Sequence, residues 1–512
     1  MKDKILDTLE YIGGRIEDFT SKLGRWLLET IDYFLSLALK NIGSKNHDLT
    51  ASFDAPRKLL TKRGRGFALG DRFMDLKKSE ENLVVIASTG SGKSQSVVIP
   101  SIIHASISGH SQVITDGGDL AMLVPLLKYY NDQVLYLELD NLQPSVFYNP
   151  LARLSLSNKS GINKVAFMLQ NSGQGGSDTK GGDMYFSQKS QELIALVITL
   201  LLELGILKYI NIANVFWICE NMMAYPKKID KLFANTSEVT WVKYKALDGT
   251  SENTKSSIVS SATASLSHIG NDPTLCTITS KDNIDFSSFR TQQTALLLKA
   301  PIGSTYHNTI ISLFMEQFYD FFLSKMPRSN DRHIALILDE LASIIPAIQG
   351  FSKYLSVSRK FKILTLGVLQ SESQLSQLSE AKRKSIMTNF SNKAYMGNLF
   401  DEAAQLSSIL GKYSYRDKKN PNQEKQRDLM SEFELRTMAP NTAIILSTGG
   451  IKPIKTKLLP AYKSPRLQKL MNADYPIDTD SIKHHEVSYL PLDLGSFDEI
   501  REHANNLEEE II

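Results

Sequence analysis

Short, almost continuously apolar runs recur along this 512-residue chain, and helical patterns separate them. Strands buried on both faces of a parallel sheet are apolar throughout, whereas half-exposed strands alternate apolar and polar residues. The runs therefore predict a three-layer α/β domain with a mainly parallel sheet. They lie at residues 82–87, 112–116, 134–138, 294–298, 334–338, 363–369 and 443–446.

The strand pattern is interrupted between about residue 160 and residue 285. Residues 188–204 form a long apolar segment that predicts a helix, and further helices are expected at 212–223 and 253–268. Ahead of them, residues 171–183 are rich in glycine and polar residues and predict a mobile loop. An all-α insertion into the α/β domain fits this order best.

The first residues of the chain carry a different pattern. Apolar residues spaced alternately four and three apart predict an amphipathic helix or a short coiled coil. The apolar segment 26–39 contains Glu29 and Asp32 and is too short to span a bilayer. Three candidates stay open for the partner of the apolar face: the protein's own body, another protein, or a membrane surface. The repeating positions are Ile5, Leu9, Ile12, Ile16, Phe19, Leu23 and Trp26.

Composition narrows the class of protein without identifying a partner. The chain is 42% hydrophobic and 22% charged, which is typical of a globular protein with two or more domains. Its formal net charge of +3 is too small to indicate a nucleic-acid partner by itself. Cys219 and Cys276 lack the spacing of a disulfide framework or a zinc site, which suits a reducing cytoplasm. His484 and His485 are interpreted as solvated loop residues.

The first apolar run leads directly into a glycine-rich turn and a Lys-Ser pair. In a phosphate-binding loop the backbone N–H groups converge on phosphate oxygens, the lysine reaches the β and γ phosphates, and the hydroxyl binds Mg²⁺. Ala87 replaces the usual first glycine of this motif, and a small residue still lets the turn close. We therefore expect ATP and Mg²⁺ here, the alternative being a flexible loop that matches by chance. The residues concerned are Thr89, Gly90, Ser91, Gly92, Lys93 and, as a metal ligand, Ser94.

The run at 334–338 ends in the acidic pair Asp339-Glu340. Hydrolysis of a nucleoside triphosphate needs a metal to offset phosphate charge and a base that orients and deprotonates water. We expect Asp339 to hold Mg²⁺ through water and Glu340 to activate the nucleophile. Two acids at the end of a core strand are costly without a neutralising cation, which argues against a merely structural pair.

Two further candidates follow the acidic pair. Gln370 ends the next apolar run, a position beside the γ phosphate in a parallel sheet, where an amide can report whether that phosphate is present. A buried structural glutamine is the alternative. Arg359 lies on a helical segment that leads into the same run. It is a candidate arginine finger for a neighbouring subunit's nucleotide, or else an ordinary surface arginine.

Further sequence motifs follow one another over most of the chain. Their types and their order resemble those of the type IV secretion coupling proteins, the TraG/TraD-like ATPases of bacterial conjugation. Residues 114–120 are similar to that family's D-x-K-G-E-L turn, with Gly117 in place of the lysine. Residues 149–151 match its N-P-L element, and 183–186 lie where the family enters its all-α domain. The remaining matches are Gly66–Gly70, Leu338–Ala342, Gln370-Ser371, Gln374-Leu375, Asn389, Asp428-Leu429 and Glu434–Arg436.

The resemblance implies a RecA-like nucleotide-binding domain, an inserted all-α domain, and a homo-oligomeric, hexameric ring with ATP between subunits. It implies that the protein is an ATPase that receives relaxase-bound single-stranded DNA or effector proteins and delivers them to a type IV secretion channel. Carried over by position, the nucleotide residues are those named above, and Arg359 is the arginine that acts in trans. Relatives commonly carry N-terminal transmembrane helices, whereas only the amphipathic segment is found here.

These expectations define a provisional map and two alternative functions. A membrane-anchoring partner is one way to place the protein at the inner face of the bacterial cell membrane, and a soluble cytoplasmic member is the other. A nucleotide-gated receptor for protein cargo and a double-stranded DNA pump stay open as functions, although Asn149-Pro150 and Asp183 argue against the pump. The expected parts are an amphipathic N-terminal segment (1–50), the nucleotide-binding domain in two parts (51–160 and 286–465), the all-α domain (161–285) and a C-terminal extension with an acidic, solvated tail (466–512).

Overall fold

The computed structural model describes residues 50–116, 120–140, 146–171, 181–300, 305–345, 348, 350–416, 424–473 and 486–509. The chain forms two compact units, one of Phe53–Leu406 with Ser431–Ile512 and the other of Met1–Ser52 with Ser407–Met430. The predicted N-terminal helix, Gly117, and His484 and His485 lie outside the described residues.

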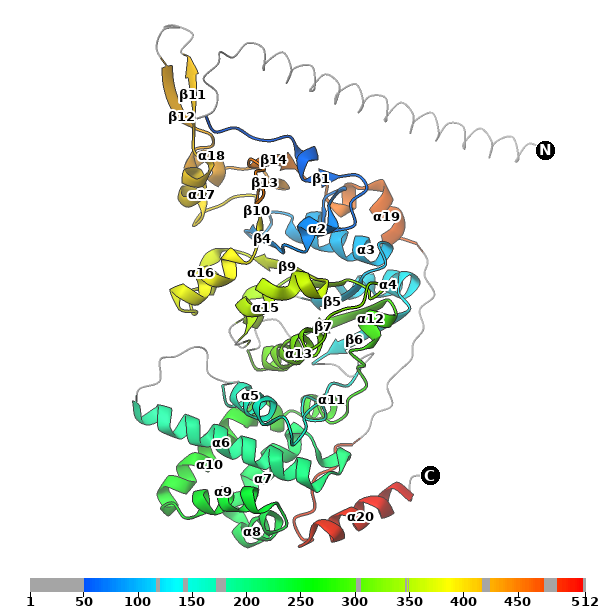
Figure 1. Cartoon of the computed structure of the whole chain (residues 1–512), viewed down its shortest axis with the longest axis vertical. Helices are drawn as coiled ribbons and strands as arrows, with labels where there is room; N and C mark the ends of the chain where they lie inside the picture. The colour runs from blue at the N-terminus through cyan, green and yellow to red at the C-terminus, as the bar shows by residue number, and fades with distance from the viewer. Residues whose placement is uncertain are drawn as a thin grey trace, which may run out of the picture. The chain divides into compact units, whose positions relative to one another are not determined.

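A nine-stranded sheet in the order β14-β13-β10-β4-β9-β8-β5-β7-β6 forms the centre of the larger unit (Figure 1). The strands from β10 to β6 pair in parallel with one another, whereas β13 pairs antiparallel with both β10 and β14 at one edge. The strands are β4 (Leu83–Ala87), β5 (Ser111–Asp116), β6 (Gln133–Glu138), β7 (Thr294–Lys299), β8 (Ile334–Leu338), β9 (Ile363–Leu369), β10 (Asn392–Met396), β13 (Thr442–Ser447) and β14 (Ile454–Lys457).

Every apolar run that predicted a strand is a strand of this sheet, and the central ones are buried along their whole length. Two strands were missed because their sequences are not apolar runs. β10 begins with Asn392, a buried side chain whose Nδ2 donates to the carbonyl oxygens of Lys78 and Asn82 at 2.7 and 2.9 Å. β14 is a short edge strand whose sequence, Ile-Lys-Thr-Lys, has one apolar residue followed by three polar ones.

Between β6 and β7 the described residues contain helices and no strand. The helices expected at 188–204, 212–223 and 253–268 correspond to α6, α7 and α10, although α6 begins at Gly181. Residues 181–183 are therefore helical and not part of a loop, while 172–180 lie outside the described residues. The helices are α5 (Lys159–Gln170), α6 (Gly181–Leu204), α7 (Ile212–Ala224), α8 (Pro226–Ala234), α9 (Glu238–Asp248), α10 (Glu252–Gly270) and α11 (Pro273–Ile278).

The Asn-Pro-Leu element holds the all-α part to the rest of the unit. Asn149 is buried, and its Nδ2 donates to the carbonyl oxygens of Ile210 at 2.6 Å and Ser280 at 3.3 Å. Its Oδ1 accepts the N–H of Leu151 at 3.0 Å. A buried amide needs partners for both of its ends, and one side chain here joins three segments.

The acidic C-terminal segment is not simply a solvated tail. α20 (Phe497–Glu509) buries Phe497, Ile500 and Ala504 on one face, while Asp498 and Glu499 are exposed on the other. These apolar positions share one helix face, which the charge count alone concealed. The Ala504 carbonyl oxygen accepts a hydrogen bond from Lys208 Nζ at 2.7 Å, which helps attach α20 to the all-α part.

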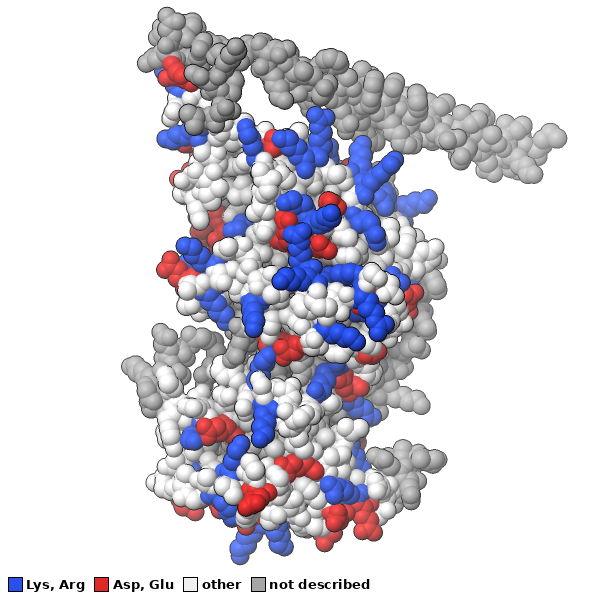
Figure 2. All heavy atoms as spheres, in the orientation of Figure 1, with Lys and Arg blue, Asp and Glu red and all other residues white. Residues whose placement is uncertain are grey.

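Charged side chains are unevenly distributed over the larger unit. Figure 2 shows mixed signs over the all-α part, whereas Lys and Arg side chains gather over the region of α2 (Leu76–Ser79), α3 (Ile99–Ile107) and α19 (Pro465–Met471). Exposed basic residues of α2 and α19 include Lys77, Arg466 and Lys469. The net charge of +3 thus conceals a locally basic surface.

The other described elements complete both units. No helix within the described part of the chain is long and apolar enough to cross a lipid bilayer. In the smaller unit, β11 (Lys412–Arg416) and β12 (Glu424–Asp428) form an antiparallel hairpin that the sequence did not predict. The remaining elements are β1 (Leu60–Thr61), β2 (Ala68–Leu69), β3 (Arg72–Met74), α4 (Val124–Tyr130), α12 (Ser288–Thr291), α13 (Thr305–Leu323), α14 (Leu341–Ile344), α15 (Phe351–Val357), α16 (Glu380–Thr388), α17 (Ala403–Leu410) and α18 (Glu432–Arg436).

Candidate nucleotide-binding site

The carboxyl ends of four neighbouring parallel strands bring the predicted site residues to one edge of the sheet. β9 lies between β4, which leads into the glycine-rich loop, and β8, which ends at the acidic pair. β5 lies on the other side of β8 and ends at Asp116. Gln370 follows β9 and therefore lies between the loop and the acidic pair, as predicted from the topology.

The loop needs glycine at two positions. Gly90 and Gly92 have φ angles of 78° and 90°, a region that other residues avoid. A Cβ atom on Gly92 would also lie 2.0 Å from Oδ1 of Asn441. The loop backbone is therefore closely supported from behind, which holds the N–H groups of a phosphate-binding turn in place.

Asn441 is the supporting residue, and the sequence analysis missed it. Its backbone N–H donates to the Ser91 carbonyl oxygen at 2.9 Å, and its Oδ1 accepts from Ser96 Oγ at 2.8 Å. Its φ angle of 59° is a left-handed conformation that asparagine tolerates better than most residues. Asn441 directly precedes β13, about 350 positions from the loop, so only its turn sequence, Pro-Asn-Thr, could have marked it.

The helix after the loop starts irregularly, for a reason visible in the sequence. Residues Ser94–Val98 form a π-helical turn before α3. Pro100 has no N–H and cannot donate to the Ser96 carbonyl oxygen, which instead accepts the N–H of Gly70 at 2.6 Å. Gly70 has a φ of 67°, and a Cβ there would lie 2.6 Å from the Leu459 nitrogen. The Gly66–Gly70 motif thus supports the phosphate-binding loop through its helix.

Asp339 has the most perturbed environment at this edge. Its side chain is buried, and its Oδ1 accepts no hydrogen bond. Burial raises the pKa of the Asp339 carboxyl to about 6; Lys93 lowers this pKa, and the charges of Glu340 and Asp116 raise it further. A buried carboxylate with an unused oxygen, close to a lysine and two other acids, is suited to a cation.

Glu340 and Gln370 are linked by a third residue. The side chain of Gln374 accepts the Gln370 N–H through Oε1 at 2.8 Å and reaches Glu340 Oε1 through Nε2 at 3.5 Å. The Gln370 side chain itself is exposed, which does not fit the alternative of a buried structural glutamine. Gln374 is part of the Gln374-Leu375 match to the coupling-protein family, but the sequence did not indicate a role for its side chain.

Arg359 is the one predicted site residue that lies elsewhere. It belongs to η7 (Ser358–Phe361), directly before β9, and is therefore at the amino-terminal edge of the sheet. Its side chain is 56% exposed, and its NH1 lies 3.5 Å from Glu81 Oε1. β9 is seven residues long, so the two edges are about 20 Å apart. Arg359 does not reach the phosphate-binding loop of its own chain.

The sheet order, the loop at its carboxyl edge and the acidic pair with its buried Asp339 define a P-loop nucleotide-binding protein with an all-α region. The sequence model of the family described as "Type IV secretory system Conjugative DNA transfer" matches residues 53–484, and the chain belongs to this family. The predicted relationship to the type IV secretion coupling proteins is thereby confirmed.

Solved structures support the fold. The chain is similar to a bacterial conjugative coupling protein, TrwB lacking its N-terminus, in complex with sulphate: the TM-score is 0.64 at 18% identity, covering 81% of this chain and 95% of that one. TrwB with the ATP analogue ADPNP gives 0.63 at 18% identity, covering 81% and 95%. TrwB with ADP and Mg²⁺ gives 0.62 at 18% identity, covering 80% and 92%. The predicted RecA-like α/β domain with an all-α region is confirmed. The comparison with curated proteins found no match.

Proposed function

We propose that this protein hydrolyses ATP to drive relaxase-bound single-stranded DNA, protein cargo, or both into a type IV secretion channel. The observation that carries the proposal is the acidic pair of buried Asp339 and half-buried Glu340 at the carboxyl edge, separated by one strand from a closely supported phosphate-binding loop. Membership of the conjugative transfer family supports the choice of cargo. The binding of ADPNP, and of ADP with Mg²⁺, by TrwB supports the choice of nucleotide.

The residues at this edge fit Mg²⁺. Mg²⁺ prefers oxygen ligands and keeps several waters, and when bound it would offset the charge of the phosphates. Asp339 offers a buried carboxylate oxygen with no hydrogen-bond partner, and Ser94 offers a hydroxyl at the start of the helix after the loop. The raised pKa of Asp339 reflects the burial of a carboxylate whose charge Lys93 offsets only in part.

The other residues take roles that their positions support. The loop N–H groups and Lys93 bind the phosphates, and Lys93 also offsets part of the negative charge around Asp339. Glu340 orients water and accepts its proton, and Gln374 holds the Glu340 carboxylate in position. Gln370, fixed through its backbone by the same Gln374, lies where an amide can contact the γ phosphate.

Arg359 acts in this proposal on the nucleotide of an adjacent subunit. Its position at the opposite edge of the sheet excludes a role at its own loop, and its exposed side chain is available to another subunit once it leaves Glu81. A homo-oligomeric ring, for which we propose a hexamer, would place one subunit's amino-terminal edge against the next subunit's loop. The guanidinium would then stabilise the negative charge that develops on the phosphates.

The receptor and pump alternatives are less well supported. A nucleotide-gated receptor needs a phosphate-binding loop, but it does not need an acidic pair arranged for hydrolysis, with Glu340 held by Gln374. Membership of the conjugative DNA transfer family does not favour a double-stranded DNA pump. We propose that the protein acts at the inner face of the bacterial cell membrane, with relaxase or effector proteins and channel proteins as partners. A membrane-anchoring partner is part of this proposal.

Mixing two inactive variants tests the composite site. Lys93→Ala should abolish nucleotide binding or turnover, and Arg359→Ala should abolish turnover while leaving nucleotide binding nearly intact. In mixed oligomers an intact loop can meet an intact Arg359, so part of the ATPase activity should return. Activity retained by the Arg359→Ala protein alone would contradict the assignment, and so would a mixture that stays inactive although the two proteins co-assemble.

A further inference from the structure

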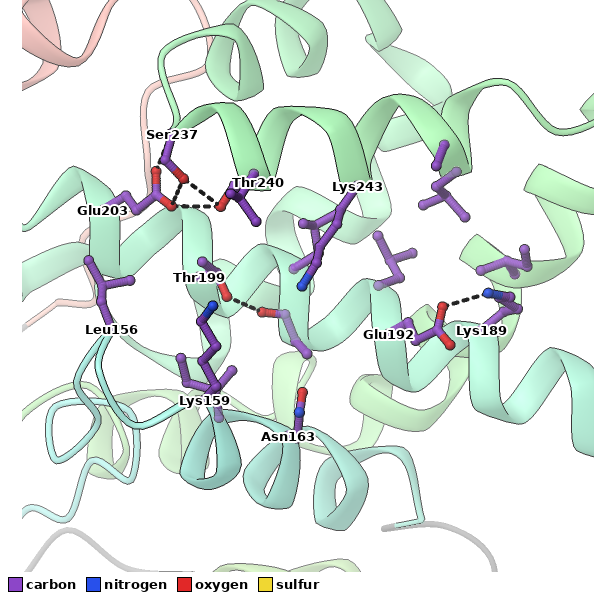
Figure 3. Close-up of a pocket in the computed structure, with 18 of the residues that line it drawn as sticks. Leu156, Lys159, Asn163, Lys189, Glu192, Thr199, Glu203, Ser237, Thr240 and Lys243 are labelled. Carbon is purple, nitrogen blue, oxygen red and sulfur yellow. Dashed lines mark hydrogen bonds and ion pairs between the residues drawn. The ribbon is translucent and has the colours of Figure 1, made fainter.

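A groove without an assigned role runs along α6 in the all-α part, with walls from α5 and α9 (Figure 3). Its volume is about 780 Å³. Residues from Tyr185 to Glu203 of α6 line it, a helical distance of about 27 Å at 1.5 Å per residue. A groove of this length is suited to an extended or helical peptide segment and is long for a compact metabolite.

The base and rim of this groove are apolar. Ile162, Leu193, Leu196 and Ile258 form a buried base from three helices. At the rim, Val239 of α9 is 59% exposed. Leu156 and Tyr185, which are 43% and 48% exposed, also line the groove. Apolar grooves of this kind are a common binding surface for amphipathic peptide segments. The groove therefore provides the hydrophobic part of a docking surface.

The charged residues that line the groove are Lys159, Lys189, Lys243, Glu192 and Glu203, so the positive charges exceed the negative ones by one. Glu203 keeps its negative charge, but its oxygens already accept the N–H and hydroxyl of Ser237 and the hydroxyl of Thr240 at 2.6–2.8 Å. Glu192 pairs with Lys189 at 2.6 Å. The two other charged residues of the lining are Lys159 and Lys243.

Within the described residues, Lys159 and Lys243 make no hydrogen bond or ion pair. Figure 3 shows their side chains extending from opposite walls, Lys159 from α5 and Lys243 from α9, toward the space between the helices. Carboxylates of a ligand bound in that space would pair with these two lysines. The groove thus combines an apolar base with a site for negative charge.

We propose that the α6 groove binds an acidic amphipathic segment of a protein cargo, with apolar side chains on the base and carboxylates at Lys159 and Lys243. This inference rests on the proposed function only in taking cargo as the source of the segment. Helix-in-groove recognition supplies the energy through the apolar anchors, and the two lysines select the charge of the ligand.

Three synthetic helical peptides test the proposal against the full-length protein by fluorescence anisotropy. All carry the same leucines at helical spacing, and the positions between them are glutamate, glutamine or lysine. We expect the glutamate peptide to bind most tightly. Lys159→Ala/Lys243→Ala should weaken it about tenfold, since two such pairs contribute up to about 1.4 kcal/mol, and should leave the glutamine peptide unchanged.

Two control variants separate charge from packing. Lys227→Ala/Lys281→Ala removes two exposed lysines of the same part of the chain that do not line the groove, and should change no affinity. Val239→Ser removes an apolar contact at the rim without adding a charge and should weaken all three peptides. Equal binding of the glutamate and lysine peptides, no binding of the glutamate peptide, or an unchanged affinity in the Lys159/Lys243 double variant would overturn the proposal. No nucleotide is present in these measurements, so a failure of ATP turnover would leave their result unaffected.

Discussion

Replacing Asp339 with asparagine removes a carboxylate that the fold buries beside two other acids, and the effect on stability depends on pH. The side chain of Asp339 is buried, and burial first, then the net effect of neighbouring charges, leaves its pKa at about 6 against an ordinary value of 3.8. The folded protein therefore binds this proton more tightly than the unfolded chain does. Ionisation destabilises the fold progressively between about pH 4 and pH 6.

The magnitude follows from the two pKa values. At neutral pH the destabilisation approaches about 3 kcal/mol, because each pH unit between the folded and unfolded values corresponds to about 1.4 kcal/mol. Structural relaxation makes this an upper limit. We expect nucleotide-free Asp339→Asn protein to be more stable than wild type by roughly 1–3 kcal/mol at about pH 7.5, and no more stable at about pH 4.

Thermal and denaturant unfolding at both pH values, without nucleotide or Mg²⁺, measure this difference. Glu340→Gln is the matched control, because Glu340 is only partly buried and its neutralisation should produce a smaller gain. Addition of Mg²⁺ and ATP analogue should stabilise wild type more than the Asp339→Asn protein. An Asp339→Asn protein that is less stable than wild type by the same amount at both pH values would refute the reasoning, since ionisation of the buried carboxyl would then have no effect on stability.

Three further substitutions test the supports of the site and of the fold. Gly92→Ala should abolish nucleotide binding because the new Cβ would clash with Asn441. Gly450 also has a positive φ, but a Cβ there would meet no atom within 4 Å, so Gly450→Ala should cost only about 1 kcal/mol of stability. Equal effects of the two substitutions would contradict the predicted clash with Asn441. Gln374→Ala should lower the single-turnover rate about tenfold and leave nucleotide affinity nearly unchanged, whereas an unchanged rate would remove Gln374 from the site. Lys164→Met should destabilise the protein by about 3 kcal/mol, because it leaves the buried Glu316 carboxylate, 2.8 Å from the Lys164 ammonium, without its cationic partner. Adding Glu316→Gln should recover much of this stability. A Lys164→Met protein as stable as wild type would contradict the prediction.

The sequence predicted the central strands and marked the candidate nucleotide residues because both patterns are encoded locally. Strands buried on both faces appear as apolar runs, and the glycine-rich loop and the Asp-Glu pair directly follow two of them. The order of those strands in the sheet then brings Lys93, Asp339 and Gln370 to one edge.

Other features could not be predicted because they depend on contacts between distant segments. Asn441 supports the loop from a turn near the far end of the chain, and Gly70 donates to the carbonyl oxygen that Pro100 leaves without a helical partner. α20 was interpreted as an acidic tail because its apolar face has only a few residues, Phe497, Ile500 and Ala504. The position of Arg359 relative to its own loop became clear only once the strand directions were known.

The rate of ATP hydrolysis against protein concentration, with and without single-stranded DNA, tests the central claim most directly. If ATP sites lie between subunits of a DNA-handling motor, the rate per subunit should climb steeply as the protein assembles and rise further with DNA. A rate per subunit that does not depend on concentration and is indifferent to DNA would contradict that account and favour a nucleotide-gated receptor for protein cargo.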